Sequence, residues 1–103
     1  MEITWQAHHA VISDRLRAKA TALLDKLERR LDRAIRATVR FEREGTRCRV
    51  EIVISTPRHR PLVAEGNGRY YGPALVVAFK HLAHQASAEK RTAKDRAHRT
   101  VRR

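Results

Sequence analysis

The sequence is poor in the residues that mark secreted and membrane proteins. It has a single cysteine, Cys48, in 103 residues, which excludes a disulfide within the chain and is compatible with a reducing compartment. No apolar run approaches the roughly 18 residues that a membrane-spanning helix needs. The first ten residues lack the charged and apolar regions of a signal peptide. We therefore expect a cytoplasmic protein with no membrane segment.

Acidic residues are scarce relative to basic ones. The chain holds 23 Lys and Arg against 11 Asp and Glu, a net charge of +12. Its length suits one domain with a modest core. An excess of this size exceeds what solubility requires and is typical of a protein that neutralises the phosphates of a nucleic acid. Anionic membranes are the competing polyanion.

Two segments show the periodicity of amphipathic helices. Residues 13–33 carry a leucine stripe without Gly or Pro, and Ser13 is placed to accept a hydrogen bond from the first turn. A second helix begins near Gly72-Pro73, where proline loses no hydrogen bond because the first turn has none to lose. Its apolar stripe ends at Ala86, but good helix formers follow, so we expect the helix to reach about residue 95 and then fray.

Other segments alternate apolar and polar residues, as strands do. We expect a turn at 44–46, with Gly66-Asn67-Gly68 ending the last strand. The expected strands cover residues 2–6, 35–42, 47–55 and 62–65. The order β-α-β-β-β-α predicts an α+β fold, a two-layer sandwich with two helices on one face of a four-stranded sheet and the other face open. The predicted domain spans residues 1–95, and residues 96–103 form a basic, flexible tail.

Basic residues gather in both predicted helices and in a loop between two prolines. Duplex RNA is read mainly through its shape, phosphates and 2′-hydroxyls, so such contacts carry no sequence preference. The ordinary alternative for charge runs is a solvated face, and the size of the net charge favours RNA. The candidate RNA-binding residues are Lys26, Arg29, Arg30, Arg33, Arg36, Arg58, Arg60, Lys80, His84, Lys90, Arg91, Lys94, Arg96 and Arg99.

The two tyrosines have both a functional and a structural interpretation, whereas the tryptophan and the cysteine have a structural one. Tyr70 and Tyr71 could stack on unpaired bases, or cover the edge of the core as aromatics near a strand–helix junction usually do. Trp5 is expected in the core. Cys48 alternates in phase with apolar residues and is expected to be a buried, inert thiol.

Catalytic and metal-binding patterns find no support. His8 and His9 are expected to point apart in a strand. His81 and His84 have a spacing at which two side chains can share a metal, but no third ligand accompanies them. We therefore expect these histidines to contact RNA phosphates. We expect neither a metal nor a cofactor. Glu51 and Glu65 are potential cross-strand neighbours among arginines, which indicates a surface ion pair. We expect no enzymatic activity and no small-molecule substrate.

Short segments along nearly the whole chain match one known family in their order and spacing. They are residues 3–4, 11–17, 24–28, 31–33, 64–66 and 80–85, together with the two alternating strands and the basic end. Together they resemble the ribosome hibernation-promoting factor family, also called ribosome-associated inhibitor A or S30EA-like proteins, in its short form without a second domain. Residues 68–75 depart from the family's pattern, because Arg69 replaces an acidic residue at the start of the second helix.

The resemblance implies a fold similar to double-stranded RNA-binding domains and a site on the small ribosomal subunit, against 16S rRNA, in the channel of messenger and transfer RNAs. Occupying that channel would inhibit translation under stress or in stationary phase. We expect a monomer. A general structured-RNA-binding module and a protein-interaction module that uses the open sheet face are the alternatives. The family's rRNA contacts, carried over, point to Lys26, Arg29, Arg33, Lys80, Lys90, Arg91 and Lys94.

Overall fold

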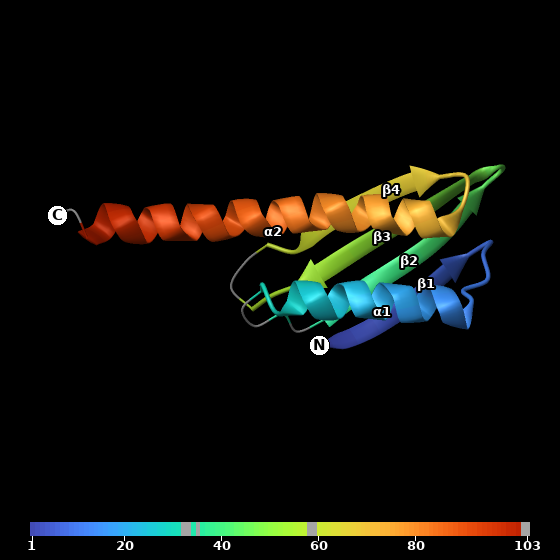
Figure 1. Cartoon of the computed structure of the whole chain (residues 1–103), viewed down its shortest axis with the longest axis horizontal. Coiled ribbons are helices and arrows are strands. Elements are labelled where there is room, and N and C mark those ends of the chain that lie inside the picture. The colour runs from blue at the N-terminus through green and yellow to red at the C-terminus, as the bar shows by residue number, and fades with distance from the viewer. Residues whose placement is uncertain (32–33, 35, 58–59, 102–103) are drawn as a thin grey trace.

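The computed structural model describes the backbone of residues 1–31, 34, 36–57 and 60–101, and the side chains of those up to residue 88. Both helices cover the same face of a four-stranded sheet in the order β1-β2-β3-β4 (Figure 1). The predicted two-layer α+β fold is thereby confirmed. The elements are β1 (Glu2–His8), α1 (Asp14–Glu28), β2 (Arg36–Glu44), β3 (Arg47–Ser55), β4 (Leu62–Gly68) and α2 (Tyr71–Val101).

The sheet is mixed. β1 pairs with β2 in parallel, and the pairs β2–β3 and β3–β4 are antiparallel. Parallel neighbours need a crossover connection, which α1 supplies. β2 and β3 are joined by a tight turn in which Gly45 has a φ of 59°, a conformation that glycine adopts without steric cost. The predicted hairpin is confirmed, while Ile35, expected at the start of its first strand, lies outside the described residues.

The core lies between the sheet and the helices. Alternate residues of β2 and β3 point into it, so Val39, Phe41 and Ile52 have no exposed surface, and Leu24 and Leu82 cover them from the helices. This alternation is why each strand carries one apolar and one charged face. Cys48 is buried as predicted, and its Sγ donates to the Arg69 carbonyl at 3.4 Å.

Helix α1 begins where the sequence predicts and ends earlier. The hydroxyl oxygen of Ser13 accepts a hydrogen bond from the backbone N–H of Leu16 at 3.1 Å. The helix ends at Glu28 and not near residue 33. The chain must turn here to bring β2 parallel to β1, and the N–H of Arg30 tightens the turn by donating to the Leu27 carbonyl. Residues 32 and 33 lie outside the described residues.

Strands β1 and β4 are longer than expected. β1 continues to His8, and β4 runs through Gly66 and Asn67 to Gly68, where the sequence predicts a break. A Cβ on Gly66 would lie 2.6 Å from the Ala78 nitrogen and still closer to the Ala74 carbonyl oxygen. Gly66 therefore does not end the strand; it lets the backbone of α2 approach the sheet closely.

Helix α2 outruns the rest of the domain. It begins at Tyr71, so Pro73 falls in the first turn as predicted, and it ends at Val101 and not near residue 95. Residues 87–101 extend the helix by about 22 Å, at 1.5 Å per residue, beyond Ala86, the last buried residue among the side chains that the structure describes. This projection gives the molecule its 56 Å long axis (Figure 1). The flexibility of a basic tail over 96–103 stays a prediction, and residues 102 and 103 lie outside the described residues.

Two side chains of α2 bind the outer edge of β4. The Nδ1 of His81 lies 3.0 Å from the Glu65 carbonyl oxygen, and Gln85 donates to the Val63 carbonyl at 2.7 Å. From His81 to Gln85 the helix rises about 6 Å, and from Val63 to Glu65 the strand rises about 6.8 Å. Because these two distances nearly match, both side chains can reach the strand. Because a carbonyl only accepts, His81 carries its proton on Nδ1 here. The free edge of β4 is thereby covered.

Candidate nucleic-acid interface

The open face of the sheet carries charges of both signs in register. Arginine and glutamate lie directly across from each other on neighbouring strands, an arrangement that stabilises a sheet. The described pairs are Glu2 with Arg36, Arg40 with Glu51, Glu42 with Arg49, and Glu44 with Arg47. These charges nearly cancel, so the chain's large positive excess must reside on the helices and the loops.

Arg49 is the centre of this charge network. Its Nε donates to Glu65 at 2.9 Å, and its guanidinium also reaches Glu51 at 3.1 Å and Glu42 at 3.3 Å. Glu51 and Glu65 are cross-strand neighbours, as predicted, and Arg49 offsets their mutual repulsion. The hydrogen bond from Arg49, followed by its positive charge, holds the pKa of Glu65 below its ordinary value.

Replacement of Arg49 by Gln is expected to destabilise the domain in a pH-dependent way. The pKa of Glu65 is lowered in the folded state, so the stability gained from this pair is present above the ordinary glutamate pKa of about 4.3 and is lost as the pH falls through the folded-state value. The loss at pH 7 should be about 1 kcal/mol or less, because the pair is solvent-exposed. Urea unfolding of Arg49→Gln and wild type at pH 7 and pH 3 checks this: the difference should narrow at pH 3, and a difference that widens would contradict it.

Four basic residues on the helix side of the domain differ from the arginines of the open sheet face in their ion pairing. Lys26, Arg29, Arg30 and Lys80 are all exposed, and in the described part of the chain none of them forms an ion pair. Lys26 lies in the last turn of α1, and Arg29 and Arg30 in the turn that follows. Unpaired cations keep their full attraction for phosphate, so the helix face is the candidate interface.

The remaining candidate residues are not all brought to this face. Arg36 lies on the open sheet face, 3.7 Å from Glu2. Arg60 is exposed in the loop before β4, and His84 is exposed on α2. Arg33 and Arg58 lie outside the described residues. Five more lie in the projecting part of α2, where the backbone is helical and the side chains are not described: Lys90, Arg91, Lys94, Arg96 and Arg99.

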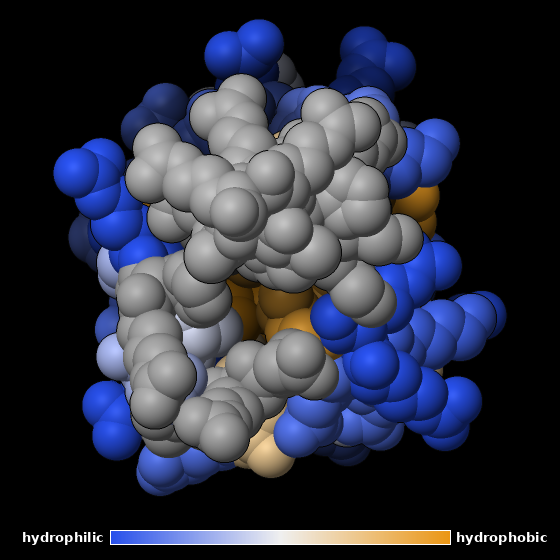
Figure 2. Space-filling model, turned by 90° about the vertical axis from the view of Figure 1, so that its left-hand side faces the viewer, coloured by the Kyte–Doolittle hydropathy of each residue, from blue (hydrophilic) through white to orange (hydrophobic). Residues whose placement is uncertain are grey.

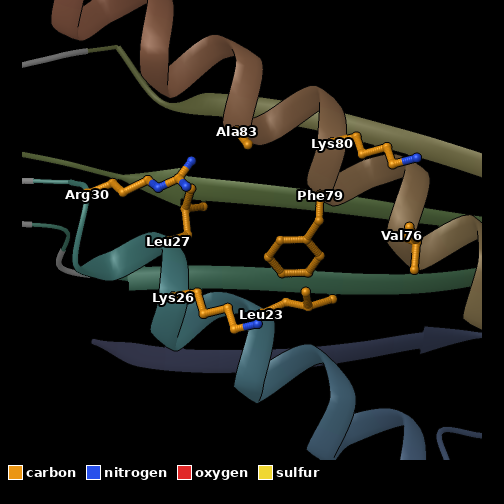
Figure 3. A pocket seen from close by; sticks show the side chains of 8 residues that line it. All are labelled: Leu23, Lys26, Leu27, Arg30, Val76, Phe79, Lys80 and Ala83. Carbon is orange, nitrogen blue, oxygen red and sulfur yellow. The ribbon is translucent and has the colours of Figure 1, made fainter.

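A cavity of about 240 Å³ opens between the two helices, and this groove was not foreseen from the sequence. Its apolar floor combines leucines of α1 with Phe79, which projects from α2 toward α1 (Figure 3). Its lining comes from α1, the turn that follows α1, and α2: Leu23, Lys26, Leu27, Arg30, Val76, Phe79, Lys80 and Ala83. Apolar surface is also visible among hydrophilic residues at the end of the domain from which α2 projects (Figure 2).

The aromatic residues divide between core edge and solvent. The ring of Tyr71 packs edge-on against Phe41 with centroids 5.6 Å apart, and burial raises the pKa of Tyr71. Tyr70 is 69% exposed. Trp5 is half-buried at the edge of the core, stacked on Phe41 at 6.4 Å with the Arg17 guanidinium 5.7 Å from its ring centroid. Tyr70, and not Tyr71, is therefore the tyrosine exposed enough to stack on a base.

The histidines form no metal site among the described residues, where no group of three potential ligands occurs. His81 bonds the backbone of β4, which is a structural role beside the predicted phosphate contact. His9 has a φ of 53° and falls outside β1, so the rings of His8 and His9 meet at 4.4 Å and do not point apart.

Fold and charge together define the class: a small α+β domain whose nearly neutral sheet backs a layer of basic helices. The chain belongs to the sigma 54 modulation protein / S30EA ribosomal protein family, whose model matches residues 3–94. The resemblance to hibernation-promoting factors is thereby confirmed. No curated protein sequence matches the chain.

No helix in the described residues is long and apolar enough to cross a membrane.

Two solved structures share the fold. A ribosomal subunit interface protein from Coxiella burnetii superposes with a TM-score of 0.81 at 18% sequence identity, covering 87% of this chain and 98% of that one. The N-terminal domain of Protein Y from Thermus thermophilus superposes with a TM-score of 0.73 at 24% identity, covering 84% of this chain and 96% of that one. Identities this low show a common fold.

Proposed function

We propose that this protein binds the small ribosomal subunit through 16S rRNA, in the channel of messenger and transfer RNAs, and thereby inhibits translation on idle ribosomes under stress or in stationary phase. The S30EA family assignment supports a ribosomal partner. In this proposal the protein acts in the cytoplasm, as a monomer, by occupying space and not by catalysis.

The observation that carries the proposal is the separation of charge between the two faces. The open face of the sheet pairs its arginines with glutamates, whereas Lys26, Arg30 and Lys80 on the helix side have no acidic partner among the residues that the structure describes. Helix α2 extends this side beyond the core over residues that include five further cations. A basic helix that projects beyond the core fits a narrow channel lined by phosphates.

Cosedimentation tests the proposal. The protein should migrate with purified vacant 30S subunits at low salt, and a tenfold mass excess of blunt duplex RNA should leave most of it bound there. If duplex RNA displaces it in proportion to phosphate concentration, it is a general RNA-binding module. If it stays at the top of the gradient, the proposal is wrong. Salt dependence cannot distinguish a ribosome-specific protein from a general RNA-binding module, because the affinity of any phosphate-binding protein falls steeply with salt.

A further inference from the structure

The groove between α1 and α2 combines an apolar floor with basic residues at its rim. Its floor is apolar and is built around Leu23, Leu27 and Phe79. Lys26 and Arg30 stand at its α1 side and Lys80 at its α2 side (Figure 3). Because none of these cations has an acidic partner among the described residues, the groove presents a hydrophobic floor inside a positively charged rim.

Small side chains keep the groove open. Val76 and Ala83 occupy the positions of α2 that face the α1 leucines, and neither reaches far enough to fill the space. At about 240 Å³ the groove is smaller than the roughly 300–1,000 Å³ of drug-sized sites. A space of this size matches one flat ring system.

We propose that the groove receives a single unstacked nucleotide of RNA, with the base against Phe79 and the leucines and the flanking phosphates on Lys26, Arg30 and Lys80. This inference rests on the proposed function and deepens it. A ligand that consists of phosphates alone would bind the cations and leave the apolar floor unused. An acyl chain or an apolar peptide would bind the floor and leave the cations unused. A nucleotide uses both, because every base has an apolar face and the sugar–phosphate chain carries the charge.

Filling the groove without changing its charge tests the inference. Ala83→Phe and the milder Ala83→Leu occupy the space, whereas Ala18→Phe makes the same exchange at an exposed position of α1 that does not line the groove. Affinity for 30S subunits should fall by about tenfold or more in both Ala83 variants, as expected for loss of one base contact. The dependence of log affinity on log salt should keep its slope, because no phosphate contact is lost. Ala18→Phe should bind within about twofold of wild type.

A second probe separates this inference from the ribosomal proposal. An RNA hairpin with an unpaired loop should bind wild type about tenfold more tightly than a blunt duplex with the same number of phosphates, and Ala83→Phe should abolish that preference. Wild-type affinity of the folded Ala83 variants for 30S overturns the inference while leaving the ribosomal proposal intact. If the Ala83 variants bind 30S subunits more weakly and log affinity also depends less steeply on log salt, the inference is overturned, because the groove would then bind phosphates and not a base. Loop preference without 30S binding supports the groove and refutes the ribosomal proposal.

Discussion

Simultaneous replacement of Lys90, Arg91 and Lys94 by glutamate is expected to lower the affinity for 30S subunits by at least about a hundredfold. These residues lie in the part of α2 beyond Ala86, where the helix leaves the core. Each exchange removes a charge-assisted contact worth about 1.5–3 kcal/mol and places an anion against the phosphates. The thermal midpoint should change little, because surface substitutions outside the core usually shift stability by about 0.5 kcal/mol or less each.

The matched control reverses the same number of charges at the other end of the domain. Arg43, Arg47 and Arg69 are exposed near the β2–β3 hairpin, away from the end at which α2 projects (Figure 1). Their replacement by glutamate changes the net charge equally and should weaken binding far less. Cosedimentation at several salt concentrations measures both variants. Equal losses in the two variants would show that net charge, and not the projecting helix, governs binding.

Replacement of Gly66 by Ala is expected to lower the thermal midpoint by more than about 10 °C. The added Cβ meets backbone atoms of α2 at Ala74 and Ala78, and backbone cannot rotate aside as a side chain can. The helix must shift away from the sheet, and overpacking of this kind costs about 1–3 kcal/mol or more. A loss of 1 kcal/mol corresponds to about 4–8 °C in a domain of this size.

Gly68→Ala is the control for this prediction, because it makes the same exchange in the same strand. There the nearest atom to an added Cβ is the Tyr70 carbonyl oxygen at 3.6 Å, an ordinary contact. This variant should unfold within a few degrees of wild type in a calorimetric scan. A Gly66→Ala protein as stable as Gly68→Ala would mean that α2 does not approach β4 as closely as described.

Periodicity predicted the architecture because burial on one side imposes it. The alternation of Val39, Phe41, Val50 and Ile52 could be satisfied only by a sheet covered on one face. The sequence failed where tertiary packing overrides a local signal. Gly66 was interpreted as a break, although it continues the alternation of Leu62 and Ala64 and faces alanines on α2. The ends of both helices were also wrong, because good helix formers near an end do not specify where the chain turns.

The candidate interface was predictable in composition and not in arrangement. Counting Lys and Arg located the basic helices, but only the register of the strands shows that the arginines of the sheet are paired with glutamates. The groove was missed because it depends on how two helices pack. The only signal was that Leu23 and Leu27, and likewise Phe79 and Ala83, are four residues apart, which puts apolar residues on one side of each helix, with the small Ala83 among them.

Hydroxyl-radical footprinting of 16S rRNA in 30S subunits tests the central claim most directly, namely that the basic helices bind rRNA where messenger and transfer RNAs pass. Wild type should protect nucleotides that line the channel between head and body. The Lys90→Glu, Arg91→Glu, Lys94→Glu variant should protect none of them at the same concentration. Protection confined to the solvent side of the subunit, or an identical footprint from the triple variant, would contradict the account.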